Sequence, residues 1–457
     1  MKKIMLLVVF SLFVMSNSVM ADTESFGPDE WTQYRMNSEN NPVFNGEISD
    51  EIKEVIKTGN EIRSTPVVVG DNVYIGNHKS GGIYSYNIKT KKFNWKAEAP
   101  NWIHSEIIYA NNQLFVGYGN RFFQEDGTRG TEESGVLSLD PESGEILWDF
   151  KTKGEVMPTP AFYEDTLYIT TGDKHLYAVD PVKGEEKWRL ELGHTISMSS
   201  PNIKDGILYV GGGNPRPYTF FAVDLNKREI LWETSYEDVY LGMDDVPPAI
   251  YKNQYVITTG LEETDDPSKP NHMIYAMDLK TGEVKWKDSF GTGKNVENNK
   301  SGAPVVYGDQ VFVGSPITKT FYSYDAKTGK QLWNYPSNVN KAPPVADNDI
   351  VYFTDTKGYV YAFDTETGDL LGKKELGGKL APSGPVLMSG HLIVGSQDTN
   401  VYILPIKEIL NVKDSNLQGA KVSKSGFSYV WPALALLVVV LGILILIRIR
   451  NMKRNAQ

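Results

Sequence analysis

One phrase recurs along most of this chain and limits what the chain can fold into. "YAVDPVKGEEKW" at 177–188 returns as "YAMDLKTGEVKW" at 275–286 and as "YSYDAKTGKQLW" at 322–333. A seventh copy, "YAFDTETGDLLG", places Gly372 where the tryptophan would fall. The tryptophans that end the other copies are Trp95, Trp148, Trp188, Trp232, Trp286 and Trp333. Self-similarity at a spacing of roughly 40–50 residues predicts one small structural unit used many times.

The residues around each tryptophan predict strands and tight turns. Most copies carry an aspartate eight residues before the tryptophan and a glycine in the turn, and the first copy carries Asn87 in place of the aspartate. Aspartate ties such a turn and glycine accepts a positive φ, as in β-hairpins. A second strand pair, opened by proline, precedes each phrase, as in "STPVVVGDNVYIG" at 64–76. The period within each unit is two, which excludes solenoids of helical repeats.

These units predict an all-β fold, an eight-bladed β-propeller of four-stranded blades. Seven units contain all four strands, while the eighth, at 383–405, supplies only three. Residues around 52–58 align with an outer strand, so we expect them to pair with 399–404 and close the ring. Each tryptophan should lie on the outer part of its blade and pack against the neighbouring blade, which is a structural role.

Both ends of the chain carry targeting signals. Residues 1–21 have two lysines, a short apolar run and small residues before Asp22, which predicts a cleaved signal peptide. Residues 430–447 are an uninterrupted apolar stretch long enough for a transmembrane helix, and four basic residues follow it. The positive-inside rule makes residues 448–457 a cytoplasmic tail. We therefore expect a single-pass protein of the cell membrane, with the propeller (22–405) extracytoplasmic on a stalk (406–429).

The composition excludes several functions. The chain has no cysteine, so disulfides, thiol catalysis and cysteine-ligated zinc are absent. The formal net charge is −11, and it is more negative without the six basic residues of the two ends, which disfavours a nucleic-acid partner. The six histidines show no HExxH spacing, and no G-x-S-x-G or Walker A motif occurs.

Candidate ligand-binding residues come from the loops that share one face of a propeller. Ligands usually gather there, near the axis. On this face we expect Trp102, His104, His194, Asp244 and Asp245. Acidic residues in 233–248 and 261–272 could hold Ca²⁺, although a solvated acidic face is the favoured interpretation. Arg121, Arg129 and Arg216 could meet an anion, and loop-surface charges are favoured for them too.

The repeat resembles the tryptophan-docking motif of the PQQ-like, quinoprotein alcohol dehydrogenase-like propellers. Residues 177–188 and 275–286 match that motif closely, and "WTQYRMNSENNPVFNG" at 31–46 resembles the family's usual entry segment. The resemblance covers about residues 31–405 and implies an eight-bladed propeller. The family includes PQQ- and calcium-dependent dehydrogenases as well as non-enzymatic envelope scaffolds. The dehydrogenases usually stack PQQ against a disulfide of adjacent cysteines, which this chain lacks.

Three functions remain open at this point. The leading hypothesis is a non-catalytic, membrane-anchored scaffold that binds an extracytoplasmic protein or envelope polymer, with no cofactor. The alternatives are a PQQ/Ca-dependent quinoprotein dehydrogenase and a glycan-acting enzyme. The shape and lining of the axial funnel should discriminate between them.

Overall fold

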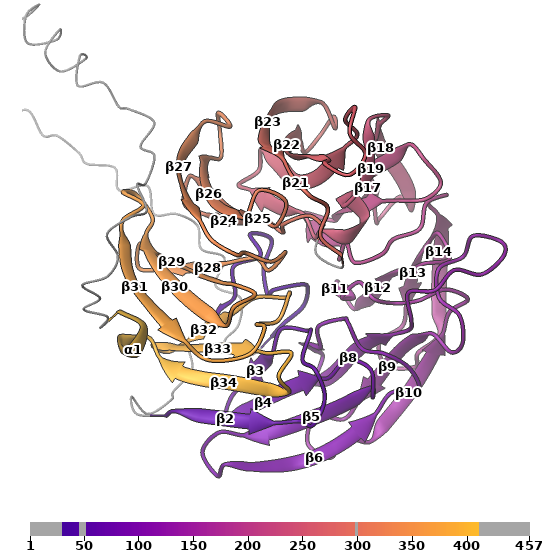
Figure 1. Ribbon diagram of the computed structural model, residues 1–457. Helices are drawn as coiled ribbons and strands as arrows, with labels where there is room; N and C mark the ends of the chain where they lie inside the picture. Colours follow the sequence, from indigo (N-terminus) through magenta and orange to yellow (C-terminus); the bar gives the residue numbers. More distant parts are fainter. Residues whose placement is uncertain (1–29, 45–51, 298–299, 411–457) are drawn as a thin grey trace, which may run out of the picture.

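The protein forms a ring of eight β-sheets arranged around a central axis. The computed structural model describes residues 30–44, 52–297 and 300–410. The eight sheets follow one another around the ring in the order of the sequence, and each begins at the axis (Figure 1). The predicted all-β, eight-bladed propeller is therefore confirmed.

The first four blades follow a simple up-and-down order. Blade 1 comprises β3 (Val67–Val69), β4 (Asn72–Gly76), β5 (Gly82–Asn87) and β6 (Lys92–Glu98). Blade 2 comprises β7 (Ile108–Ala110), β8 (Gln113–Tyr118), β9 (Gly135–Leu139) and β10 (Ile146–Lys151). Blade 3 comprises β11 (Ala161–Tyr163), β12 (Thr166–Thr170), β13 (His175–Val179) and β14 (Glu186–Glu191). Blade 4 comprises β15 (Asn202–Lys204), β16 (Ile207–Gly212), β17 (Tyr218–Asp224) and β18 (Glu229–Tyr236).

The remaining blades add short elements to this plan. Blade 5 comprises β20 (Ala249–Tyr251), β21 (Tyr255–Glu262), β22 (Asn271–Asp278) and β23 (Val284–Thr292), and β19 (Val239–Leu241) also pairs with β21. The 3-10 helix η1 (Met243–Asp245) lies between β19 and β20. Blade 6 comprises β24 (Val305–Tyr307), β25 (Gln310–Ser315), β26 (Thr320–Asp325) and β27 (Gln331–Pro336). Blade 7 comprises β28 (Val345–Asp347), β29 (Ile350–Thr354), β30 (Tyr359–Asp364) and β31 (Leu370–Glu375).

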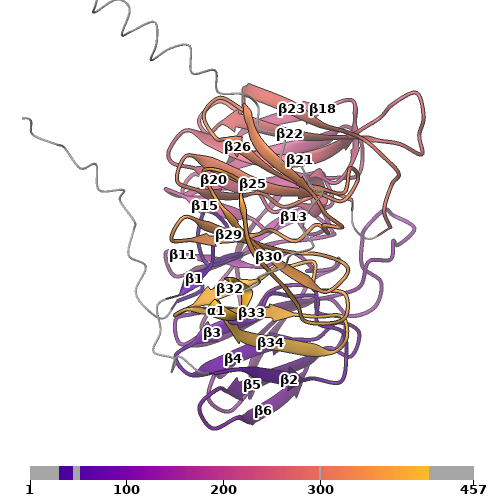
Figure 2. The ribbon, with the colours of Figure 1, turned by 60° about the vertical axis from the view of Figure 1, so that its left-hand side comes forward.

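Blade 8 joins the two ends of the propeller. Its β32 (Val386–Met388), β33 (His391–Gly395) and β34 (Asn400–Pro405) come from the end of the propeller sequence. Its outer strand is β2 (Glu54–Lys57), which runs antiparallel to β34 (Figures 1 and 2). The predicted ring closure is confirmed. The sequence did not predict β1 (Val43–Phe44), which pairs in parallel with the innermost strand β32.

The tryptophans dock each blade onto the next one. The indole N–H of Trp95 donates to the carbonyl of Pro141, and that of Trp333 donates to Thr365, each over 2.9 Å. Trp148, Trp232 and Trp286 make the same bond to the turn of the following blade. The indole ring packs directly against the turn glycine of the next blade. A Cβ on Gly144, for example, would lie only 2.5 Å from the ring of Trp95, so a larger residue would clash there. The five turn glycines also have φ between 69° and 74°, so two constraints select glycine there.

Three interfaces in the ring depart from this pattern. Arg228 replaces the turn glycine beneath Trp188, and its guanidinium lies 5.8 Å from the centre of the ring. Gly372, the missing seventh tryptophan, lies against the backbone of α1 (Lys407–Leu410), which leaves no room for a side chain. At the closure of the ring, Glu54 pairs with Lys91.

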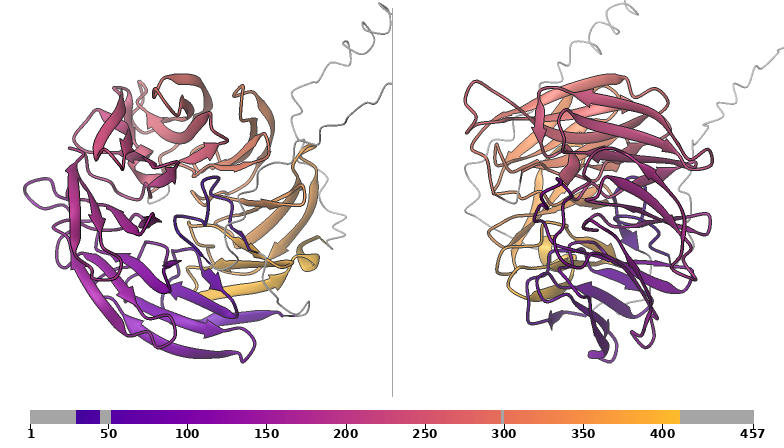
Figure 3. Two further views of the ribbon diagram at one scale, coloured as in Figure 1. Left: turned by 180° about the vertical axis from the view of Figure 1, so that it is seen from behind. Right: turned by 90° about the vertical axis from the view of Figure 1, so that its right-hand side faces the viewer.

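Residues 31–44 form an N-terminal plug that closes one end of the axial channel. Seen from behind, this segment crosses the centre of the ring (Figure 3). It bonds to the innermost strand of every blade. The partners in blades 1 to 8 are Val68, Tyr109, Phe162, Ile203, Ile250, Val306, Ala346 and Leu387. The plug therefore ties all eight blades to one segment.

Arg35 is the most heavily bonded side chain of the plug. Its guanidinium is fully buried and donates to the carbonyls of Asn40, Pro344, Ser383 and Pro385. Asn40 donates in turn to the carbonyl of Pro248. The prolines that open the inner strands thus present carbonyls that the plug satisfies, which a buried backbone acceptor requires.

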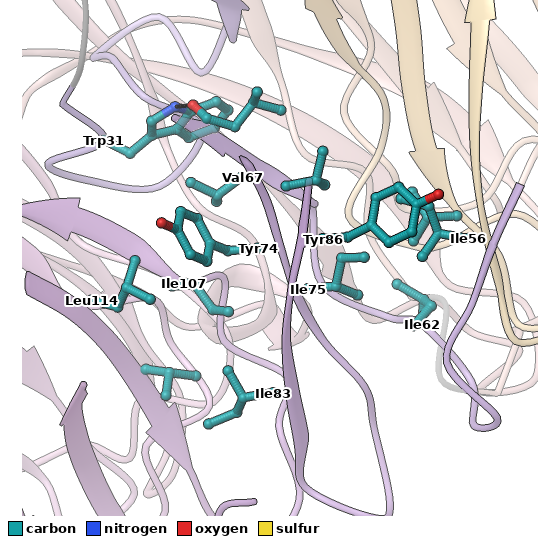
Figure 4. Close-up of a cluster of buried hydrophobic side chains, with 14 of the residues drawn as sticks. Trp31, Ile56, Ile62, Val67, Tyr74, Ile75, Ile83, Tyr86, Ile107 and Leu114 are labelled. Atoms are coloured by element: carbon teal, nitrogen blue, oxygen red, sulfur yellow. Dashed lines mark hydrogen bonds between the residues drawn. The ribbon is translucent and has the colours of Figure 1, made fainter. Parts of the chain in front are cut away.

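The hydrophobic core is divided among the blades and their interfaces. Around blade 1, aliphatic and aromatic side chains from several strands pack together with Trp31 of the plug (Figure 4). The predicted signal peptide, transmembrane helix and cytoplasmic tail lie outside the described residues, as does most of the stalk. Within the described residues, every helix is too short and too polar to span a bilayer.

Candidate functional site: a cationic axial funnel

A funnel of about 690 Å³ opens on the face opposite the plug. Its walls are the links between blades and the loops between second and third strands, as the sequence predicted for the ligand-binding face. A smaller chamber below it reaches down to Tyr34 of the plug. Ligand pockets are commonly of this size. The funnel is therefore the candidate site.

The lining of the funnel has the opposite charge sign to the whole chain. Six basic and three acidic residues line it, although the chain carries a net charge of −11. The basic residues are Arg63, Lys79, Arg121, Arg129, Lys300 and Lys341, and the acidic ones are Glu61, Asp244 and Asp245. A concave wall with an excess of one charge focuses the electric field and attracts the opposite charge. The funnel is suited to an anion.

Arg129 is held at the wall by a buried carboxyl. It contacts Glu155 and the hydroxyl of Ser197 at short range. Glu155 is fully buried, and burial raises the pKa of its carboxyl to about 8. One of its oxygens, Oε2, has no hydrogen-bond partner. A guanidinium fixed in this way is ready to donate to a ligand oxygen.

Two adjacent aspartates differ in their surroundings. Burial and the neighbouring Asp245 raise the pKa of Asp244 to about 6. Asp245 instead pairs with the ammonium group of Lys341 over 3.0 Å. The backbone that carries them is fixed, because the carbonyl of Asp244 accepts three N–H groups, from residues 197 to 199. Asp244 is therefore a carboxyl that can exchange a proton near neutral pH inside the funnel.

An aromatic wall descends along one side of the funnel. Phe122 lies edge-on to Trp102 with ring centres 5.6 Å apart, and Trp102 lies 5.1 Å from His78. His78 and His104 meet through their Nε2 atoms, so at most one of the two carries a proton there. Burial lowers the pKa of His78 to about 3 and that of His104 well below its usual range. Both imidazoles are neutral at pH 7.

A buried carboxyl lies in the lower chamber. One oxygen of Glu106 accepts the backbone N–H of Arg35 over 2.9 Å, and the other has no partner. Burial raises the pKa of Glu106 to about 7. Arg63 lines both the funnel and the chamber, and its Nε lies 3.5 Å from a carboxylate oxygen of Glu61. These groups make the floor of the funnel polar.

The structure brings together four of the five residues predicted for the site. Trp102, His104, Asp244 and Asp245 line the funnel. His194 does not, since its ring packs on Phe221 and its Nδ1 lies 3.1 Å from the carbonyl of Gly213. Ligand binding by these residues stays a prediction.

The three loop arginines that could meet an anion lie in two different places, and binding of an anion by any of them stays a prediction. Arg121 and Arg129 line the funnel, whereas Arg216 pairs with Glu263 at the exposed surface. Sequence reasoning missed Arg63, Lys79, Lys300 and Lys341 altogether. They come from four separate links and loops, and their only shared signal is that each lies in a connection between two strands.

The expectation that the funnel binds neither PQQ nor calcium stays a prediction. Within the described residues, no three histidine or acidic side chains converge as metal ligands would. Calcium requires six to eight oxygens. The disulfide ceiling that the resemblance implies cannot form in a chain without cysteine.

The fold and the funnel define a class, the eight-bladed propellers with docking tryptophans and an axial funnel. Within that class, the family model described as "Outer membrane protein assembly factor BamB" matches residues 41–130 and 132–374. The chain belongs to this family of PQQ-like repeat proteins.

The relatives include both an enzyme and assembly factors. The chain is 25% identical to a tetrathionate hydrolase of Acidithiobacillus ferrooxidans, over 84% of this chain and 87% of the relative. It is 24% identical to the assembly factor BamB of Burkholderia pseudomallei, over 75% and 84%.

Solved structures show the same fold. The BamB of Moraxella catarrhalis superimposes with a TM-score of 0.56 at 15% identity, covering 78% of this chain and all of that one. A europium-containing methanol dehydrogenase gives 0.59 at 14%, covering 82% and 89%.

Proposed function

We propose that this protein is a binding propeller of the cell envelope whose funnel captures an anionic ligand. The observation that carries the proposal is the excess of basic over acidic residues in the funnel of an acidic chain. The leading form is a non-catalytic scaffold, exported and anchored by the apolar stretch at 430–447. Its partner would be an extracytoplasmic protein with an acidic segment. The relatives named as assembly factors agree with a protein-binding role.

The physical reason is a local reversal of the field. Away from the funnel, a negative surface repels acidic partners, and this repulsion suppresses unspecific capture. Inside the funnel, basic groups approach the axis from blades 1, 2, 5, 6 and 7 and their links. An anion is therefore attracted to the axis alone.

Binding of anionic probes to the full-length protein in detergent tests this proposal. We expect an acidic peptide of mixed glutamate and aspartate to bind, and Lys79→Gln combined with Lys300→Gln to weaken binding at least about tenfold. The matched control is Lys89→Gln with Lys227→Gln, which removes the same charge from the outer surface. Equal losses in the two double variants would reject the funnel as the site.

A second candidate function is hydrolysis of a small sulfur oxyanion. It is favoured by Asp244, whose raised pKa suits proton transfer near neutral pH in a site rich in cations. The relative named as a tetrathionate hydrolase makes tetrathionate the first compound to try. Consumption of tetrathionate by the wild type, lost in Asp244→Asn, would favour this candidate over the scaffold. Binding without consumption would favour the scaffold.

A further inference from the structure

Two phenylalanines at the mouth of the funnel are exposed without an evident structural reason. Among the described residues, eight large hydrophobic side chains are exposed, and Phe122 (51%) and Phe123 (52%) are the only aromatic ones. The other six lie on outer strands or an outer turn. Phe122 and Phe123 are instead next to each other and line the funnel. Exposed aromatic side chains at a concave site commonly mark a binding surface.

The loop that carries these phenylalanines is firmly held. The carbonyl of Phe122 accepts the N–H of Gly130 over 2.6 Å, and the N–H of Phe122 donates to the side chain of Asn120. Phe123 forms an isolated bridge with Arg129. Because the backbone is fixed on both sides, little conformational entropy remains to be lost when a ligand contacts the two rings.

The exposed rings continue into the aromatic wall and stand beside cations. Phe122 packs on Trp102, which leads to His78 on the funnel side. Arg121 and Lys79 also line the funnel, and both lie close enough to His78 for their charges to lower the pKa of its imidazole, so this wall carries cations as well as aromatic rings. The opposite wall carries Asp244, Asp245 and Lys341, and among the described residues it has no exposed aromatic ring. One side of the funnel therefore suits an apolar group attached to an anion.

From this asymmetry we propose that the aromatic wall is a subsite for a large apolar side chain within an extended acidic segment of the partner. The inference rests on the proposed function and specifies the partner's chemistry. A funnel of about 690 Å³ admits a short segment and excludes a folded domain. The acidic residues of the segment meet the cations, and the apolar side chain lies on Trp102, Phe122 and Phe123. Charge then guides the segment to the axis, while the apolar contact sets specificity.

Two labelled peptides of equal length and charge test the inference with the full-length protein. Both are acidic, and they differ only in a central phenylalanine or serine. We expect the phenylalanine peptide to bind at least about tenfold more tightly to the wild type. In Phe122→Ser combined with Phe123→Ser, this ratio should fall to near one, because the phenylalanine peptide loses its additional affinity. The control is Val182→Ser, an exposed apolar residue on an outer turn.

The possible outcomes separate the inference from the proposed function. Equal affinity of both peptides for the wild type overturns the inference and leaves the anion-binding funnel intact. Binding of tetrathionate but of neither peptide overturns the inference and favours the small-anion candidate. Failure of all three probes to bind rejects the proposed function itself. Retention of the tenfold ratio in the Phe122→Ser, Phe123→Ser variant also overturns the inference. The variant Phe122→Leu combined with Phe123→Leu keeps the apolar surface, so it should preserve the ratio.

Discussion

At the scale of single residues, Glu106 makes the stability of the ring depend on pH. Its folded-state pKa is about 7, raised by burial, whereas an exposed glutamate has a pKa of about 4.3. Between these values the unfolded chain releases a proton that the folded chain retains. The free energy of unfolding should therefore fall as the pH rises from about 4.3 to about 7, by up to about 4 kcal/mol.

Glu106→Gln isolates this contribution. The variant keeps an oxygen that can accept the N–H of Arg35 and cannot ionise. We expect its pH profile to be flatter than that of the wild type over the same range, measured by urea unfolding at pH 5 and pH 7.5. A variant with the wild-type slope would show that other groups cause the dependence.

Single residues of the funnel could be named from the sequence only where their type is unusual. Trp102 and His104 stand out in a link, and the Asp244–Asp245 pair stands out in a long one. Lys300 and Lys341 are ordinary lysines, and nothing local separates them from surface lysines. Their place in the funnel becomes visible only in the folded ring, which brings five or more segments to one axis. The sequence alone does not contain this spatial arrangement.

At the scale of the blade, the docking tryptophans should contribute unequally to stability. Trp333 is 1% exposed, bonds to Thr365 and packs among the rings of Phe321 and Phe363. Trp188 is half-buried, and within the described chain its indole N–H has no acceptor. We expect Trp333→Ala to cost about 3–5 kcal/mol of unfolding free energy, and Trp188→Ala clearly less.

Chemical unfolding of the two variants under one condition measures this difference. Substituting the turn glycine beneath Trp333, as Gly368→Ala, should destabilise as well, because the added Cβ meets the indole. Equal costs at Trp188 and Trp333 would contradict the role assigned to the docking bond.

Elements with a repeated pattern were predictable, and those without one were not. The four-strand unit and the β2–β34 closure follow from aligned phrases and alternating side chains. The strand β1 is two residues long and pairs with β32, which is distant in the sequence. The strand β19 is three residues long and pairs with β21 across an irregular link. Strands so short carry no period that could be recognised.

At the scale of the whole molecule, Arg35 connects the plug to blades 7 and 8. Its guanidinium reaches carbonyls of Pro344, Ser383 and Pro385, which three donors in a fixed plane can satisfy together. Arg35→Lys keeps the charge and loses this geometry. We expect a loss of about 3–5 kcal/mol, since buried carbonyls and a buried ammonium group are left poorly paired.

The matched control for this substitution is Arg189→Lys, at an exposed position beside Glu186. Its thermal unfolding should resemble that of the wild type, because exposed ion pairs contribute little. A mild effect of Arg35→Lys, equal to that of the control, would contradict the importance of the plug for the ring.

The plug and β2 also determine when the ring can be completed during synthesis. The plug (31–44) and β2 leave the ribosome before all eight blades are made, yet the partners of β2 reach as far as Ile403. A nascent chain that ends before blade 8 therefore contains blades in an open ring. Its plug and β2 still lack part of their partners, and the sheet edges at the gap are unpaired. Chains interrupted at that stage are the ones most prone to associate with each other, so synthesis has to continue through blade 8 before the ring is protected from aggregation.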